Sequence, residues 1–131
     1  MPLVLPTRPL QRTAMPNAHE VRRFWAFRLS HGLYRRFTCE ADAMRSFRCF
    51  GCGLSLLPID RAHIRPLWAG GGNDVWNLHL LCKICHVESE DIWGRTYWRW
   101  LFGRKLDDVL AIADGRREFG QGVPQMPPQA A

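Results

Sequence analysis

Four cysteines stand in two pairs that share one spacing. Two residues separate Cys49 from Cys52, and Cys82 and Cys85 repeat this gap. Such a gap lets both sulfurs of a pair approach one tetrahedral ion while amides of the turn donate hydrogen bonds to them. The chain has five cysteines, an odd number that argues against a closed set of disulfides. The spacing therefore predicts one structural Zn²⁺ held by four thiolates, with Cys39 as a buried thiol outside the site.

The stretch between the two pairs is longer than in an ordinary four-cysteine zinc finger. Between Cys52 and Cys82 lie 29 residues, against the roughly 15–20 of the usual spacing. A zinc ion that joins such distant segments holds the base of an insert, so the residues of the insert are candidates for function. The insert contains Asp60, His63 and three consecutive glycines, and it leads into His86.

The sequence DRAHIRPLWAGGGNDVWNLHLLCKICH, residues 60–86, resembles the signature of the HNH nucleases, in the His-Me finger (ββα-metal) superfamily. In that family a histidine followed by Ile and Pro begins the motif, a double glycine and an Asn-Leu pair follow, and C-x2-C-H ends it. The matching residues here are His63-Ile64, Pro66, Gly70-Gly71, Asn77-Leu78 and Cys82-x2-Cys85-His86. The resemblance covers Cys49 to about Glu90, roughly a third of the chain.

This resemblance implies a metal-dependent HNH endonuclease that hydrolyses phosphodiester bonds of DNA. Such hydrolysis needs a base for the attacking water and a divalent cation for the charge on the phosphate and the leaving oxygen. By the resemblance, His63 is the general base, Asn77 orients the base or the hairpin, and His86 holds the catalytic cation, Mg²⁺ or another divalent ion. Many family members have Asp or His immediately before the base, where this chain has Ala62. In an extended segment Asp60 shares a face with Ala62, so Asp60 is a candidate to reach or support the ion, with a turn or salt-bridge role as the alternative.

The positive charge of the chain lies in its N-terminal part. The formal net charge is +6, with 18 Lys and Arg against 12 Asp and Glu. Residues 1–50 carry all of this excess, and residues 51–131 are neutral overall. Such asymmetry favours a nucleic acid partner, which we expect to be double-stranded DNA. The candidate phosphate contacts are Arg61, Arg65, Arg22, Arg23 and Arg28. For any single arginine, a solvated helix face is the competing interpretation.

The elements that must position these residues predict a small α+β fold. We expect a flexible basic arm over residues 1–16, a single domain over residues 17–118 and a flexible tail over residues 119–131. Within the domain, N-terminal helices (17–47) precede a ββα-metal core with a four-cysteine zinc knuckle (48–90), and C-terminal helices (91–118) follow. The predicted elements are helices over 18–29 (capped by Asn17), 83–90, 91–102 and 106–113, a strand over 56–64 and an extended segment over 76–81.

The sequence also limits where and with what the protein acts. No apolar stretch approaches the roughly 18–20 residues that span a bilayer, and no signal peptide is evident. We therefore expect a cytoplasmic protein without a membrane partner, in the host cell cytoplasm if a phage encodes it. Small nucleases of this kind resemble those of phages, mobile elements and restriction systems. One active site cuts one strand, so a double-strand break requires a homodimer or a second visit.

A second function class keeps the cysteines and arginines without catalysis. It is a catalytically inactive, zinc-stabilised nucleic-acid-binding module, which needs neither His63 nor His86. The absence of a ligand at Ala62 favours this alternative. The presence of both histidines at the family spacing favours the nuclease.

Overall fold

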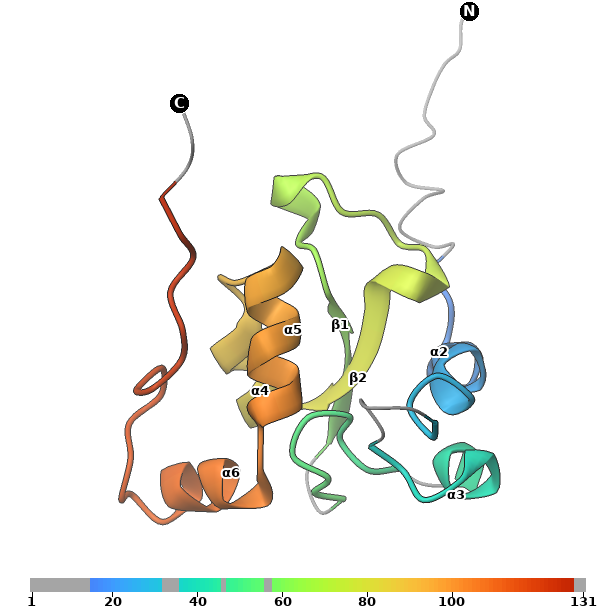
Figure 1. Ribbon diagram of the computed structural model, residues 1–131, viewed down its shortest axis with the longest axis horizontal. Coiled ribbons are helices and arrows are strands. Elements are labelled where there is room, and N and C mark those ends of the chain that lie inside the picture. The colour runs from blue at the N-terminus through green and yellow to red at the C-terminus, as the bar shows by residue number, and fades with distance from the viewer. Residues whose placement is uncertain (1–14, 32–35, 46, 56–57, 129–131) are drawn as a thin grey trace, which may run out of the picture.

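A two-stranded antiparallel hairpin lies at the centre of the molecule (Figure 1). The computed structural model describes residues 15–31, 36–45, 47–55 and 58–128. The hairpin consists of β1 (Ile59–His63) and β2 (Leu78–Cys82), and helix α4 (Lys83–Ser89) follows β2 without a break. This strand–strand–helix order, together with the helices around it, confirms the predicted small α+β fold.

The flanking helices cover the hairpin from two sides (Figure 1). One side is formed by the N-terminal helices and the other by α4 and the C-terminal helices. The remaining elements are α2 (Ala18–Ala26), α3 (Glu40–Arg45), α5 (Gly94–Gly103), α6 (Leu106–Ala113) and two short 3-10 helices in the β1–β2 connection, η1 (Leu67–Ala69) and η2 (Val75–Asn77).

The register of the hairpin fixes where the functional side chains lie. Ile59 pairs with Cys82 at one end, and His63 pairs with Leu78 at the other. Every residue of β2 is buried, whereas β1 is only partly buried. The motif histidine therefore lies at the end of the hairpin opposite to the cysteine at the end of β2.

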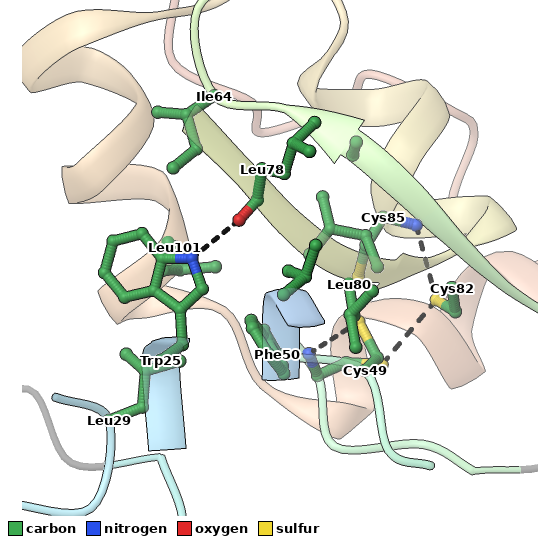
Figure 2. Packing of buried hydrophobic residues seen from close by; sticks show 14 of the residues in the cluster. Trp25, Leu29, Cys49, Phe50, Ile64, Leu78, Leu80, Cys82, Cys85 and Leu101 are labelled. Carbon is green, nitrogen blue, oxygen red and sulfur yellow. Dashed lines mark hydrogen bonds between the residues drawn. The ribbon is translucent and has the colours of Figure 1, made fainter. Parts of the chain in front are cut away.

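Helix α2 begins as predicted and is tied to the hairpin. The Asn17 side chain accepts a hydrogen bond from the Glu20 amide (2.8 Å), and the Glu20 carboxylate accepts one from the Asn17 amide (2.9 Å). This reciprocal capping satisfies two amides that the first helical turn leaves without partners. Further along the helix, the buried Trp25 donates from Nε1 to the Leu78 carbonyl (2.7 Å; Figure 2). The N-terminal helix is thereby attached to the core strand.

Several predicted boundaries are shifted in the structure. The helix predicted over 18–29 ends at Ala26, and turns follow it. The predicted strand starts at Ile59, with residues 56–57 outside the described part. Trp76, expected to be extended, lies in η2. The helix predicted from residue 91 begins at Gly94, whose left-handed φ of 64° prevents a regular helix from running through this point.

The segment after α6 lies against the domain. The Gly120 amide donates to Glu88 Oε2 (2.6 Å), and the Trp93 amide donates to Met126 Sδ (3.4 Å). Val123 and Met126 pack on the edge of the core. The flexibility expected of residues 119–131 stays a prediction, and most of the predicted arm (1–16) lies outside the described residues.

Candidate active site and metal centre

The four cysteines of the two pairs converge inside the core. Their Sγ atoms all lie within 4.8 Å of one another, and all four residues are buried. Cys49 and Cys52 lie in the turn over residues 49–53, here called the knuckle turn, while Cys82 ends β2 and Cys85 lies in the first turn of α4. Figure 2 shows three of these residues around one point. The fifth cysteine, Cys39, is exposed, so its expected burial is wrong.

The geometry of the sulfur cluster fits a tetrahedral ion. Zinc–sulfur bonds of about 2.3 Å at tetrahedral angles separate two sulfurs by about 3.8 Å, and Cys52 Sγ lies 3.8 Å from Cys82 Sγ. Backbone amides point at the sulfurs, from Gly51 to Cys49 (3.2 Å) and from Cys85 to Cys82 (3.4 Å). Such N–H···S bonds stabilise thiolates and orient them toward a metal. A donor set of sulfur alone suits Zn²⁺ and does not suit Mg²⁺ or Ca²⁺.

Two guanidinium groups lie beside the sulfurs. Arg104, only 4% exposed, donates from Nε to Cys85 Sγ (3.3 Å) and from Nη1 to Glu88 Oε1 (2.6 Å). Arg36 donates to backbone carbonyls of the knuckle turn, including that of Gly51. Four thiolates around Zn²⁺ carry a net charge of −2, so two adjacent cations offset the charge of the centre.

His63 ends β1, where a loop residue holds its ring. Nε2 of His63 lies 2.8 Å from Asn73 Oδ1. Because an amide oxygen only accepts hydrogen bonds, Nε2 carries the proton and Nδ1 keeps the lone pair. Asn73 directly follows the three consecutive glycines of the insert. The sequence offered one indication of this contact: Asn73 lies in the connection between the two strands, and such a connection begins and ends at the same end of the hairpin.

Asn77, expected to orient either the base or the hairpin, contacts the backbone of the hairpin connection. Its buried side chain accepts a hydrogen bond from the Arg65 amide (2.9 Å) and donates to the carbonyls of Arg65 (3.0 Å) and Gly72 (2.9 Å). The connection is so tight that a Cβ on Gly71 would lie 1.8 Å from the Arg65 carbonyl oxygen. Asn77 and Gly71 thus fix the shape of the loop that contains Asn73.

His86 and Asp60 form a pair across α4 and β1. His86 Nδ1 lies 2.9 Å from Asp60 Oδ2, and Lys83 Nζ lies 3.9 Å from the same oxygen. Because a carboxylate only accepts, Nδ1 of His86 carries the proton and Nε2 is left for a ligand. A carboxylate that holds one nitrogen of a histidine is the usual partner of metal-binding histidines. Asp60 thus contacts the predicted metal ligand and also forms the ion pair considered as its alternative role.

His63 and His86 line one open cleft of about 300 Å³. The β1–β2 connection forms one part of its lining, and the end of α4 with the following turn forms another. The remaining lining residues are Pro66, Leu67, Trp68, Ser89, Glu90 and Asp91. The structure therefore brings together the two histidines that the resemblance paired, although 22 residues lie between them in the chain.

A comparison with protein families matches the same segment. Residues 49–91 match the family model described as HNH endonuclease. The match runs from the first cysteine of the metal centre to the last residue that lines the cleft, about a third of the chain. No curated protein and no solved structure matches the chain. None of the helices in the described residues is long and apolar enough to cross a membrane.

The segment that matches the HNH family model has no ligand side chain at the position before its motif histidine. Ala62 is buried in the core and pairs with His79 in the register of the hairpin. Within the described residues, Cys49, Cys52, Cys82 and Cys85 are the only group of three or more potential ligands close enough to hold an ion. At the cleft, His86 is held by Asp60, and the carboxylates of Glu90 and Asp91 belong to the lining as well.

The arginines predicted to contact phosphate differ in exposure. Arg22 is 5% exposed and lies over the Phe47 ring, 5.0 Å from its centroid, and burial lowers its pKa. The prediction that Arg22 contacts phosphate is therefore wrong, because α3 and the following residues cover this face of α2. The other four predicted arginines, Arg23, Arg28, Arg61 and Arg65, are exposed. Arg23 also lines a surface hollow together with Asn73, the partner of His63.

Proposed function

We propose that this protein is a metal-dependent endonuclease that hydrolyses phosphodiester bonds of double-stranded DNA. The observation that carries the proposal is the shared cleft of His63 and His86. Each histidine has one ring nitrogen held by an acceptor, Asn73 Oδ1 for His63 and Asp60 Oδ2 for His86. Each therefore presents one defined nitrogen, which suits one histidine for proton transfer and the other for ligation.

His63 is the proposed general base. Imidazole is the side chain that accepts a proton most readily near neutral pH. Since Nε2 donates to Asn73, Nδ1 takes the proton from the attacking water. Asn73 keeps the ring in this tautomer and stabilises the imidazolium that forms, because its amide oxygen accepts from the charged ring as well.

His86, held by Asp60, is the proposed ligand of Mg²⁺ or another divalent cation. When bound, such a cation neutralises the charge that grows on the phosphate and the leaving oxygen. The four-cysteine centre, which we propose holds zinc, fixes the start of α4. His86 follows the ligand Cys85 directly, so its backbone is positioned by the centre.

The proposed partner is DNA, because nucleases of the HNH family act on DNA and the chain has a net charge of +6. Arg23, Arg61 and Arg65 are the proposed phosphate contacts nearest to His63. We place the protein in the reducing cytoplasm, where thiolates persist as metal ligands. Cleavage of both strands would require two copies of the chain or a second visit, because each copy has one cleft of this kind in its described residues.

One observation favours the alternative, a DNA-binding module without catalysis. Ala62 supplies no side-chain oxygen or nitrogen at the position where many HNH proteins have a ligand. A cation held by few protein groups is expected to bind weakly. Plasmid cleavage separates the two functions.

The experiment uses supercoiled plasmid, zinc-loaded protein and Mg²⁺, Mn²⁺ or no added divalent cation. We expect nicked product with a divalent cation, and none with a His63→Ala variant of unchanged zinc content. His31→Ala is the matched control, because His31 is exposed and stacks on Phe27 away from the cleft. Full cleavage by His63→Ala would remove the proposed base. DNA binding without cleavage under any cation would establish the binding module instead.

A further inference from the structure

An exposed tryptophan lies at the cleft. Trp68 leaves 70% of its surface exposed, and the neighbouring Leu67 leaves 53%. Both residues line the cleft that contains His63 and His86. Large exposed apolar side chains beside a polar cleft are typical of ligand-binding surfaces, because their exposure to water has a cost that binding removes.

The position of Trp68 is fixed before any ligand arrives. The amides of Ala69 and Gly71 both donate to the Pro66 carbonyl (2.9 Å each), which closes the turn around η1. The Trp68 ring packs nearly perpendicular to Trp93, with ring centroids 4.9 Å apart and an interplanar angle of 87°. A ring held in this way loses little conformational freedom when it binds, so its contact contributes more to affinity.

The chemistry of the cleft selects a nucleobase for this position. An aromatic ring stacks on any base, because every base has a π face. The indole of Trp68 carries no charge that would attract a phosphate. In a DNA chain bound across His63, the part that suits Trp68 is therefore a base.

A base inside an intact duplex is stacked on its neighbours and cannot reach a side chain in this way. We propose that Trp68 stacks on an unpaired nucleobase next to the phosphodiester bond held at His63. This protein then binds DNA containing unpaired bases more tightly than fully paired DNA. The inference rests on the proposed function for the location of the DNA, and it adds the structural class of substrate.

The test compares two DNAs that differ only in a short bubble of unpaired bases, one of them 2-aminopurine. Binding is measured by fluorescence anisotropy with the full, zinc-loaded chain and no added Mg²⁺. We expect Trp68→Ala to weaken binding to the bubble by about 10-fold, within the range known for base–aromatic stacking, and to change binding to the paired duplex less than twofold. Wild-type protein should quench 2-aminopurine, and Trp68→Phe should retain most of the affinity.

Trp76→Ala is the matched control. Trp76 is 58% exposed and lies in η2 of the same β1–β2 connection, but it does not line the cleft. Thermal unfolding of both variants checks that the fold is intact. Equal effects of Trp68→Ala and Trp76→Ala, an equal loss on both DNAs, or no DNA binding by wild type would each overturn the proposal.

The result is separable from that of the nuclease assay. Binding to the bubble that depends on Trp68, without cleavage of any DNA, would support the stacking site and reject the proposed catalysis. Normal plasmid cleavage together with a bubble affinity that does not depend on Trp68 would reject the stacking site and leave the nuclease in place.

Discussion

Replacing Arg104 by methionine is expected to weaken zinc binding by about 10- to 100-fold. Arg104 is the cation that donates directly to a metal-site sulfur, with Nε 3.3 Å from Cys85 Sγ. A hydrogen bond to a charged group contributes about 1.5–3 kcal/mol, and about 1.4 kcal/mol corresponds to a factor of ten in affinity. The two magnitudes agree. Methionine is the chosen replacement because it preserves most of the buried volume.

The same substitution also disturbs an ion pair, and this effect must be separated from zinc binding. Arg104 lies 2.6 Å from Glu88, whose side chain is fully buried. Breaking a buried pair destabilises a fold by about 3–5 kcal/mol when one charge is left alone. Glu88 keeps contacts with Arg117 and with the Gly120 amide, so the loss should lie below this range.

A double variant, Arg104→Met with Glu88→Met, makes the separation. It removes the carboxylate along with the guanidinium, so no unpaired Glu88 charge remains, and zinc affinity should still stay low. Zinc affinity is measured by competition with a chromogenic chelator, and the absorption of the Co²⁺-loaded protein reports on the thiolates directly. Arg99→Met is the control, because Arg99 is exposed on the same helix. Wild-type zinc affinity in Arg104→Met, or recovery of affinity in the double variant, would refute the role of the N–H···S bond.

Three further outcomes are expected from single contacts. Burial lowers the pKa of His79 to about 3, so the unfolded chain binds a proton below about pH 6.5 that the folded chain does not. The free energy of unfolding should therefore fall by about 2 kcal/mol from pH 7 to pH 5. In urea unfolding, His79→Phe should show a shallower pH dependence than wild type, and equal slopes would contradict this prediction. Asn73→Ala should slow plasmid cleavage by about 10- to 100-fold if it orients His63, while Asn73→Asp, which keeps the acceptor, should retain more activity than Asn73→Ala. Gly71→Ala should lower stability by about 1–3 kcal/mol, because the added Cβ would overlap the Arg65 carbonyl oxygen. Thermal unfolding of Gly72→Ala should show a smaller loss, because its added Cβ would lie 3.1 Å from its nearest neighbour, a side-chain oxygen of Asp74.

The features predicted well from the sequence are those that short-range covalent spacing determines. A turn brings two cysteines separated by two residues close enough to bind one ion, and the second pair repeats this pattern. The cap at Asn17 depends only on Glu20, three residues later. The order of strand, strand and helix follows from the motif, whose glycines and Asn77 close the connection.

The features that the sequence did not reveal depend on packing between distant segments. Arg22 resembles an exposed helix residue until α3 and Phe47 cover it. Arg104, at the end of α5, reaches Cys85 of α4 through the tertiary fold, and nothing in the 18 residues between the two indicates this contact. Asn73 reaches His63 because the loop folds back by an amount that depends on Gly71. In each case the residue type was visible in the sequence and its partner was not.

These long-range contacts explain why the metal centre and the cleft form one unit. Helix α4 has seven residues, a length at which an isolated helix is not stable in water. Its first turn is held at Cys82 and Cys85, and the next residue, His86, is held from β1 by Asp60. An ion bound at the four cysteines would join the knuckle turn to α4 and would thereby also determine where the imidazole of His86 lies. A structural metal bound at the four cysteines would position the His86 side chain through one peptide bond, and this proximity would let a chain of 131 residues build a defined cleft on a two-stranded sheet.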